Sequence, residues 1–283
     1  MPAETLITVL MPLHEHHAQF VEAAVRSLQD QTAPTWRALV IVEPDQQDAL
    51  ASTLSDPLRD TRIQLIANEG RGLASAFNTG MRRAETDFVA ILCADDMWER
   101  EAVAVLEREI GAHPDVGFFH SSRRVVDDDG ISISSIHRAR ENVTLIDFQT
   151  SGPVKHLLCW RRTEGLEVGG MDESLTVGPD DFDFPWIMAE HGAIFRAIGE
   201  CLYVYRDHRT RPRLTTHLPR STHMTQLASV FRKHGLSAAQ SRARLRSARR
   251  SYLRQCLYRS RFEQRIKEAF GRSAERGWRD TYR

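Results

Sequence analysis

Two pairs of adjacent carboxylates stand out because each lies beside an apolar segment. Asp95 and Asp96 follow the apolar run 88–92, and Asp180 and Asp181 precede a helical stretch. Neighbouring carboxylates repel each other, and burying either one is costly without a partner. For the first pair, one explanation is a solvated turn and the other is a divalent cation, which prefers oxygen ligands. For the second pair, capping of the following helix is the simplest explanation.

The elements that must position these groups follow a short alternation of two patterns. Apolar, β-branched runs predict strands at 5–13, 37–45, 62–68 and 87–96, with helices between them. Such alternation is typical of parallel βαβ units with helices on both faces of the sheet. After residue 100 the sequence predicts a helix, two strands joined by an Asp-Gly turn over 116–136, a further strand, a helix and a last strand. The fold class is therefore α/β, with a mixed, mainly parallel sheet flanked by helices.

Polar side chains follow three of the four N-terminal strands, where ligands of such sheets bind. They are His14 and Glu15, Glu43 and Asp45, and Asp95 and Asp96. A solvated edge explains any one strand, but acids at several strand ends favour a site. The first strand is not followed by the glycine-rich turn of a dinucleotide site, and no Walker loop is found. Acids at strand ends can instead hold Mg²⁺ or Mn²⁺ together with substrate phosphates, and the ion would neutralise a diphosphate leaving group.

The charge of the chain is distributed unevenly. Its 38 Lys and Arg balance 38 Asp and Glu, yet residues 220–283 hold 17 basic and 4 acidic residues. This tail is predicted to be helical, and three roles are open: packing on the acidic body or a partner subunit, contact with a membrane surface or anionic acceptor, or, least favoured, nucleic-acid binding. Four cysteines without a CxxC pair indicate neither zinc nor disulfides. No signal peptide or membrane-spanning run is found, so a cytoplasmic setting is expected.

Eight blocks along the chain, taken in order, resemble the motifs of a known enzyme family. They read TVLMPLHE (8–15), AVRSLQDQT (24–32), IVEPDQQD (41–48), GLASAFNTG (72–80), VAILCADDMW (89–98), GGMDESL (169–175), PDDFDFPWIMAEHG (179–192) and LYVYRDH (202–208). The chain from about residue 5 to 208 resembles an inverting, nucleotide-sugar-dependent glycosyltransferase of the GT-A fold, in glycosyltransferase family 2. The resemblance implies transfer of a single sugar from a nucleotide sugar, by default a UDP-sugar, to an acceptor hydroxyl with the help of Mg²⁺ or Mn²⁺.

The resemblance also implies roles for individual residues. Those against the donor nucleotide are Pro12, Leu13, His14, Glu15, Glu43, Asp45, Arg71, Asn78, Asp95 and Arg206. Those at the metal are Asp95, Asp96 and His208, and those that shape the acceptor pocket are Gly170, Met171, Asp172, Glu173 and Trp186. Asp181 matches the catalytic base, with Asp180 beside it. A carboxylate in that position takes the proton of the attacking hydroxyl.

The sequence departs from the family's pattern in several places. Cys93 stands where the first aspartate of the DXD motif is usual, so metal binding would rest on the two acids that follow. Pro44 replaces the second acid of the VDDGS block, and Phe77 replaces the arginine of the ARN block. The helix after Asp181 lacks a QxxRW signature, which favours single-sugar transfer over polymer synthesis. The departures leave an alternative, a non-catalytic GT-A scaffold that binds a nucleotide or, through its basic tail, an anionic partner.

The predicted organisation is a glycosyltransferase domain over 1–219 and a basic helical extension over 220–283. Within the first, residues 1–100 form a nucleotide-binding half and 101–219 an acceptor and catalytic half. His120 and His156 fall at strand positions that would face the acceptor side, although a lone histidine there is more often structural. The acceptor stays open between a natural product, a saccharide, a lipid carrier and a peptide. A homodimer through the C-terminal helices and a peripheral membrane contact are further expectations.

Overall fold

The computed structural model describes residues 6–13, 18–54, 56–176, 178–208 and 218–259. The contacts within the chain divide it into two compact units, each described here by itself. The first unit comprises residues up to 123 together with 137–205, and the second comprises 124–136 together with the chain from 206 onward. The predicted boundary at 219 divides the chain differently, and it stays a prediction.

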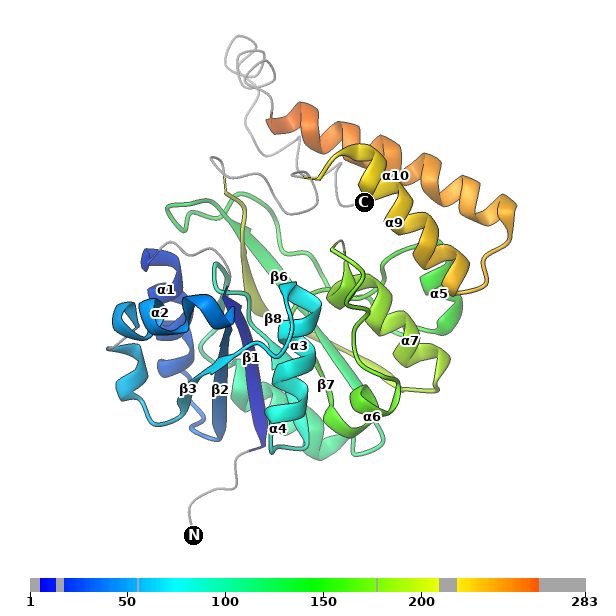
Figure 1. Cartoon of the computed structure of the whole chain (residues 1–283). Coiled ribbons are helices and arrows are strands. Elements are labelled where there is room, and N and C mark those ends of the chain that lie inside the picture. Colours follow the sequence, from blue (N-terminus) through cyan, green and yellow to red (C-terminus); the bar gives the residue numbers. More distant parts are fainter. Residues whose placement is uncertain (1–5, 14–17, 55, 177, 209–217, 260–283) are drawn as a thin grey trace. The chain divides into compact units, whose positions relative to one another are not determined.

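The described strands form one sheet of eight, in the order β3-β2-β1-β4-β7-β6-β8-β5 (Figure 1). Their bounds are β1 Ile7–Leu13, β2 Trp36–Val42, β3 Ile63–Ala67, β4 Phe88–Ile91, β5 Met97–Trp98, β6 Phe118–Val126, β7 Leu158–Arg161 and β8 Phe195–Arg206. Strands β1 to β4 pair in parallel, whereas β7 runs antiparallel to β4 and β6. The parallel half confirms the predicted βαβ units, and the antiparallel half makes the sheet mixed, as predicted.

Helices follow the strands in the alternation that the sequence predicts. The described α-helices are α1 Ala18–Gln29, α2 Gln47–Thr53, α3 Gly72–Arg83, α4 Ala102–Ala112, α5 Leu145–Thr150, α6 Arg162–Glu167, α7 Phe184–Glu190, α9 Arg220–Lys233 and α10 Ala238–Arg259. Two 3₁₀ turns, η1 Pro44–Gln46 and η2 Pro57–Arg59, lie in connections, and a π-helical turn, η3 Pro179–Asp183, leads into α7.

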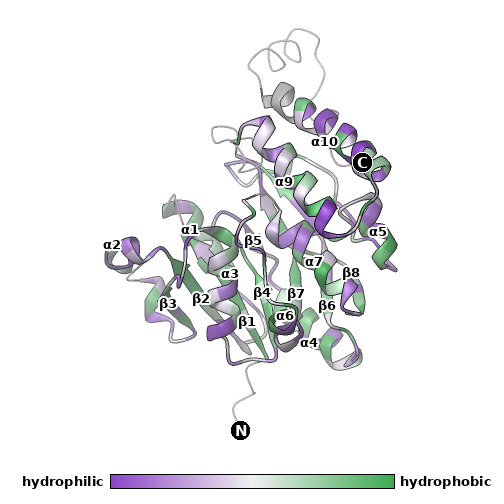
Figure 2. Cartoon of the chain, turned by 45° about the vertical axis from the view of Figure 1, so that its right-hand side comes forward, coloured by the Kyte–Doolittle hydropathy of each residue, from purple (hydrophilic) through white to green (hydrophobic). Residues whose placement is uncertain are grey.

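The core of the sheet reflects the alternation of residues along the strands and the helical spacing of residues in the helices that pack on them. Alternate residues of β1 lie in one buried cluster with the inner face of α1, and these residues are Ile7, Val9, Met11, Leu13, Val21, Ala24, Val25 and Leu28. Helix α3 packs on β1 and β2, and Figure 1 shows it crossing in front of the sheet. Figure 2 shows β1, β2 and β4 largely in the hydrophobic colour. The parallel half of the sheet is therefore largely apolar on both faces, and most of its polar groups lie at the ends of its strands. Strand β6 differs, because His120, Ser121 and Ser122 are buried in its middle.

The segment 116–136 differs from its prediction. It contains one strand, β6, and two isolated bridges, Arg123 with His137 and Val126 with Ser132, instead of two strands. The Asp-Gly turn itself is present. Oδ1 of Asp127 accepts from the backbone N–H of Asp129 (3.1 Å) and Ile131 (3.0 Å). The side chain of Asp127 thus binds the turn, as expected for an aspartate in this position.

Helices α9 and α10 of the second unit pack on each other. The Tyr252 hydroxyl of α10 donates to the carbonyl of Leu218 (2.9 Å), and the Arg244 guanidinium lies 4.9 Å from the ring centroid of Phe231. The helical spacing of the tail predicts one apolar stripe of Leu245, Tyr252, Leu253, Cys256, Leu257, Phe262, Ile266 and Phe270. Of these, Leu245 and Tyr252 are half-buried and Leu253 is exposed. The side chains of Cys256, Leu257, Phe262, Ile266 and Phe270 lie outside the described residues. None of the helices that the structure describes is long and apolar enough to cross a membrane.

Candidate active site

The first acidic pair lies in a tight turn after β4. The backbone N–H of Asp96 donates to the carbonyl of Cys93 (3.0 Å), which closes the turn. Asp96 is only 3% exposed, and its Oδ2 accepts from the Tyr203 hydroxyl of β8 (2.7 Å). The same hydroxyl accepts from the backbone N–H of Cys93 (3.3 Å). A buried carboxylate can therefore follow a buried strand because a tyrosine from a distant strand supplies its hydrogen bond.

The pKa of Cys93 reflects charges from both acidic pairs. Burial raises the pKa of the Cys93 thiol well above its usual value, and the carboxylates of Asp96, Asp95 and Asp180 raise it further. The thiol therefore stays neutral at neutral pH and is not an anionic ligand. The effect of Asp180 on Cys93 places the turn after β4 near the second acidic pair, although 84 residues separate them.

The second acidic pair lies in η3, a single π-helical turn of the kind often found at functional sites. The turn begins after Gly178, whose φ is 62°, so neither Asp180 nor Asp181 is the residue that caps it. No side-chain hydrogen bond caps α7 either, so helix capping does not explain the pair. Asp180 is buried, whereas Asp181 is exposed and is the carboxylate that can meet a substrate.

Burial and four charged neighbours shift the pKa of Asp181. Its pKa is raised above the usual value, first because the surrounding protein displaces water from it and second because Asp180 lies beside it. The positive fields of His156, Lys155 and Arg123 act in the opposite direction. Although its side chain reaches solvent, Asp181 thus lies close enough to protein atoms to be partly desolvated. A carboxyl with a raised pKa is better matched to proton transfer at neutral pH than a free aspartate.

His156 connects the two acidic pairs. Its Nε2 lies 3.3 Å from Oδ2 of Asp180, and its ring centroid lies 5.2 Å from that of Tyr203. Tyr203 in turn binds Asp96. A chain of contacts therefore runs from Asp96 through Tyr203 and His156 to Asp180. No local signal in the sequence indicates the role of Tyr203 beyond its place in the LYVYRDH block. For His156 the sequence predicts only a place on the acceptor side, and its contact with Asp180 is not predicted.

At the other end of the sheet edge, Glu43 follows β2 and is 7% exposed. Its Oε1 accepts from the backbone N–H of Gly72 (2.9 Å) and from Nδ2 of Asn68 (3.2 Å). Its Oε2 is buried and has no hydrogen-bond partner among the described residues. A buried carboxylate oxygen without a donor is costly, so this oxygen is suited to an N–H or O–H of a bound ligand.

The other residues predicted at the donor differ in exposure. Pro12 is half-buried and Leu13 is buried at the end of β1, whereas Asp45 and Arg71 are exposed. Asp95 is half-buried in the turn after β4. Two predicted residues, His14 and Glu15, lie outside the described residues. The contacts of these side chains with a nucleotide stay predictions.

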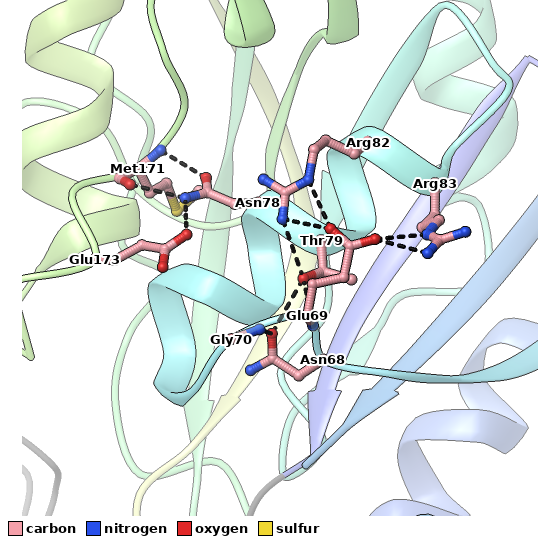
Figure 3. Close-up of polar contacts among 9 residues, drawn as sticks. All are labelled: Asn68, Glu69, Gly70, Asn78, Thr79, Arg82, Arg83, Met171 and Glu173. Atoms are coloured by element: carbon pink, nitrogen blue, oxygen red, sulfur yellow. Dashed lines mark hydrogen bonds and ion pairs between the residues drawn. The ribbon is translucent and has the colours of Figure 1, made fainter. Parts of the chain in front are cut away.

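Asn78, also predicted at the donor, holds the loop that contains the predicted acceptor residues (Figure 3). Its Nδ2 donates to the carbonyl of Met171 (2.9 Å) and to Oε1 of Glu173 (2.8 Å), and its Oδ1 accepts from the backbone N–H of Met171 (2.7 Å). Gly170 has a φ of 75°, and a Cβ there would lie 2.5 Å from Oδ1 of Asn78. The loop therefore needs both the glycine and the amide.

Helix α3, which carries Asn78, is also held by a second network of hydrogen bonds and ion pairs (Figure 3). The Thr79 hydroxyl donates to Oδ1 of Asn68 (3.1 Å), and the backbone N–H of Gly70 donates to the same oxygen (3.2 Å). Glu69 forms ion pairs with Arg82 (2.7 Å) and Arg83 (2.8 Å) of α3. Helix α3 is thus fixed both to the strand end that carries Asn68 and, through Asn78, to the loop 170–173.

The remaining predicted acceptor residues differ in their exposure to solvent. Glu173 is exposed, and Asp172 is half-buried with its Oδ1 accepting from the backbone N–H of Ser174 (3.0 Å). Trp186 is 1% exposed and lies edge-on to Phe182, with ring centroids 5.8 Å apart. Trp186 therefore packs beneath Phe182, the chain neighbour of Asp181, instead of lying at the surface. Its predicted contact with the acceptor stays a prediction.

Two predicted residues belong to the second unit. Nη1 of Arg206 donates to the carbonyls of Asp127 (3.1 Å) and Asp128 (3.0 Å). Nδ1 of His208 lies 3.0 Å from Oδ1 of Asp128. These contacts join the end of β8 to the Asp-Gly turn within that unit. The roles of Arg206 at the diphosphate and of His208 at a metal stay predictions.

The acidic turn after β4 has few candidate ligands for a divalent cation. Among the described residues, no group of three or more His, Cys, Asp or Glu could hold a metal ion. Asp95 and Asp96 nevertheless offer the oxygen donors that Mg²⁺ and Mn²⁺ prefer, and such ions often use one or two carboxylates plus substrate phosphates. The donor set therefore fits a cation that arrives with a phosphorylated substrate.

Comparison of the sequence with known families gives one family match. The profile of glycosyl transferase family 2 matches residues 8–161. The O-antigen biosynthesis protein RfbC of Myxococcus xanthus is 24% identical over 204 residues, which are 71% of this chain and 16% of RfbC. An Escherichia coli protein, UDP-Glc:alpha-D-GlcNAc-diphosphoundecaprenol beta-1,3-glucosyltransferase WfgD, is 32% identical over 96 residues, 33% of this chain and 36% of WfgD. The matched part is well under two thirds of either relative.

Solved structures share the architecture. TarS 1-349 of S. aureus in complex with UDP-GlcNAc superposes with a TM-score of 0.62 at 16% identity, over 91% of this chain and 74% of that one. Mannosyltransferase PcManGT of Pyrobaculum calidifontis in complex with GDP-Man and Mn²⁺ superposes with a TM-score of 0.58 at 21% identity, over 87% and 70%. At these identities the likeness concerns the fold, in which the two acidic pairs and Glu43 lie on strand ends and loops.

Proposed function

The chain belongs to glycosyl transferase family 2 and has the GT-A fold, and from this premise we propose that it is an inverting enzyme that transfers a single sugar. The donor is a nucleoside diphosphate sugar, first a UDP-sugar, and the acceptor is a hydroxyl of a saccharide or of a lipid-linked saccharide. WfgD is named for such a donor and a diphosphate-linked acceptor. TarS and PcManGT were solved with UDP-GlcNAc and with GDP-Man. The observation that carries the proposal is exposed Asp181 beside the buried Asp180–His156 pair, near the turn that holds Asp95.

Asp181 is the general base in this proposal. A sugar hydroxyl is a poor nucleophile at neutral pH, so its proton must leave as its oxygen attacks the anomeric carbon. Attack from the side opposite the nucleoside diphosphate inverts that carbon. Asp180 cannot share the role, because it is buried and lies against His156. Its charge instead contributes to the raised pKa of Asp181, which suits proton acceptance.

The donor diphosphate is assigned to the turn after β4. Asp95 and Asp96 would hold Mg²⁺ or Mn²⁺, which would supply neutralisation of the charge that develops on the departing diphosphate. Tyr203 fixes the carboxylate of Asp96 through a 2.7 Å hydrogen bond. At the other end of the nucleotide, Oε2 of Glu43 is left to accept from the base or the ribose.

A second candidate function, a non-catalytic nucleotide-binding scaffold, is favoured by Cys93. Its thiol is kept neutral first by burial and then by the neighbouring acids, which raise its pKa, so the turn after β4 has one anionic ligand fewer than a DXD motif. Such a scaffold would bind a nucleotide without turnover, and its binding would be unaffected by Asp181→Asn. A homodimer through α9 and α10 and a peripheral membrane contact of the arginine-rich α10 belong with either function as further proposals.

The first test is a calorimetric titration of the full chain with UDP, GDP and dTDP, each with and without Mn²⁺. The wild type, Asp95→Ala and the control Asp87→Ala are compared. Asp87 is exposed and lies before β4, at the end of the strand opposite to Asp95. Metal-dependent binding of one nucleotide that weakens tenfold or more only in Asp95→Ala supports the donor site. Binding that ignores both metal and mutation contradicts it.

The second test separates the enzyme from the scaffold. Hydrolysis of the selected nucleotide sugar is measured for the wild type and for Asp181→Asn. Loss of a general base lowers turnover by about 10²–10⁴-fold, while nucleotide affinity stays within twofold. A wild type that binds the nucleotide sugar but neither hydrolyses it nor transfers its sugar to any acceptor offered favours the scaffold.

A further inference from the structure

A group of basic side chains lies beside the η3 turn and has no part in the proposal above. It consists of His120, Arg123, His137 and Lys155, and is called the cationic cluster below. All four residues belong to the first unit. Lys155 directly precedes His156, whose Nε2 lies 3.3 Å from Asp180.

The backbone brings the cluster together from three segments. Arg123 and His137 form a β-bridge in which each N–H donates to the other's carbonyl (3.0 and 2.8 Å), so their side chains leave the same face of the pair. Nζ of Lys155 donates to the carbonyl of Gly152 (3.4 Å). A Cβ on Gly152 would lie 3.6 Å from Cδ2 of Phe182. The Lys155 ammonium is therefore held next to the turn that presents Asp181.

The charge of the cluster resides on two of its members. Burial lowers the pKa of His120 to about 4, helped by Lys155 and opposed by the backbone of Arg140. Burial also lowers the pKa of His137 to about 4, helped by Arg123 and Lys155. Both imidazoles are therefore neutral at pH 7. Burial and the Arg123 guanidinium also lower the pKa of Lys155, and only Asp181 opposes this shift. Two cations thus repel each other near Asp181, and the Arg123 guanidinium also lies 4.9 Å from the ring centroid of Tyr205.

Neutralising Asp181 is the simplest explanation of these cations, but it fits the site poorly. A permanent positive field weakens a general base, because it stabilises the ionised carboxylate. His120 is 0% exposed, and neither of its ring nitrogens makes a hydrogen bond within ordinary distance and angle limits to a described residue. Completed structural networks pair such groups. At His120, therefore, the cluster is open to a ligand rather than part of a finished internal network.

We propose that Lys155 and Arg123, with the imidazoles of His120 and His137 beside them, bind a phosphate group of the acceptor and so place its hydroxyl at Asp181. The inference rests on the proposed function and names the class of acceptor, a phosphorylated saccharide. Lys155, which is half-buried, is the member that meets the ligand from solvent. A phosphate fits two neighbouring cations better than a carboxylate does, because it offers more oxygens and more charge.

A phosphate bound here also changes Asp181. Its negative charge offsets the fields of Lys155 and Arg123, which otherwise lower the pKa of Asp181. The base is therefore strongest when the phosphorylated acceptor is in place. An acceptor without the phosphate would leave Asp181 in the full fields of Lys155 and Arg123 and would react more slowly at the same pH.

The test uses the full chain with its donor site saturated by UDP, or by whichever nucleotide binds, and Mg²⁺, so that added phosphate cannot report on the donor site. N-acetylglucosamine 1-phosphate, N-acetylglucosamine and inorganic phosphate are titrated by calorimetry. The variants are Lys155→Met, Lys155→Arg and the control Lys233→Met, whose lysine is exposed on α9. Melting curves establish that each variant is folded.

The expected result is that the sugar phosphate binds at least tenfold more tightly than the free sugar, and that Lys155→Met removes this preference. Lys155→Arg keeps most of it, and Lys233→Met changes nothing. The inference is overturned if Lys155→Met binds the sugar phosphate as the wild type does, or if both sugars bind equally. Weaker UDP binding in Lys155→Met would assign the cluster to the donor and would also overturn it.

Failure of the proposed function is distinguishable from failure of the inference. If no nucleotide binds the wild type, the donor site is refuted, and the same sugar titrations on the nucleotide-free chain still decide whether Lys155 selects a phosphate. If a nucleotide binds and is turned over but the sugar phosphate shows no preference, only the acceptor assignment fails.

Discussion

The amide of Asn78 holds the loop 170–173, and replacing it with a carboxylate removes two of its three hydrogen bonds. Asn78→Asp keeps an oxygen that accepts from the backbone N–H of Met171. It loses the donor to the Met171 carbonyl and to Oε1 of Glu173, which lie 2.9 and 2.8 Å from Nδ2. Two like-charged carboxylates then face each other across that short distance.

The loss can be estimated bond by bond. A neutral hydrogen bond contributes about 1 kcal/mol and one to a charged group about 1.5–3 kcal/mol. We therefore expect Asn78→Asp to lower the free energy of unfolding by about 2.5–4 kcal/mol. For a folded unit of this size, that corresponds to a fall in Tm of about 5–15 °C. Asn78→Ala, which removes all three bonds, is expected to cost at least as much.

Urea unfolding of the wild type and both variants at pH 7 measures the effect, and amide hydrogen exchange of Met171 shows whether the loop opens locally. The pH dependence supplies a sharper check. The new carboxyl, buried beside Glu173, has a folded pKa above its unfolded value, so the variant's deficit is smallest at low pH and grows as pH rises through the folded pKa. A change below about 0.5 kcal/mol, typical of an uncoupled surface site, refutes this account of the loop.

Further predictions concern the acidic turns. Gly178→Ala puts a Cβ 3.3 Å from Oδ1 of Asp181 at a φ of 62°. We expect the free energy of unfolding, measured in urea, to fall by about 1–2 kcal/mol and donor hydrolysis to slow. Unchanged values for both would contradict the strained turn. His156→Gln removes a positive field that lowers the pKa of Asp181; the acidic limb of the rate profile should move to higher pH, and a shift to lower pH would exclude this role. Tyr203→Phe removes the hydrogen-bond donor to Asp96. The Mn²⁺-dependent affinity for the nucleotide should then fall about tenfold. An affinity equal to that of the wild type would show that Tyr203 does not orient Asp96 for metal binding.

The sequence was sufficient for the parts of the fold that depend on local patterns. The alternating apolar residues of β1, such as Val9 and Met11, predicted a buried strand, and the structure places them in the core. Asp95 and Asp96 were predicted to follow a strand, and they lie in the turn after β4. The strand predicted after the Asp-Gly turn did not form, because only two bridges join this segment to β6.

Contacts between distant segments could not be predicted in the same way. Nothing local to Tyr203 shows that its hydroxyl reaches Asp96, because that contact depends on the order of strands in the sheet. Asn78 matched a family position for the donor, whereas its side chain is engaged with Met171, 93 residues away. Lys155 carried no motif at all, and its place near Asp181 appears only once η3 and the segment before β7 are packed.

The chain of contacts from Asp96 to Asp180 determines at which stage of synthesis these groups can come together. Its members come from residues 96, 156, 180 and 203, and the last lies on β8, which pairs with β5. Closing such long loops delays the contacts that depend on them. A nascent chain that has passed only the parallel strands can place Glu43, but it lacks Asp181 and the tyrosine that holds Asp96. Under the proposed function, translation must pass β8 before a nucleotide sugar could be consumed, and incomplete chains would leave the donor untouched.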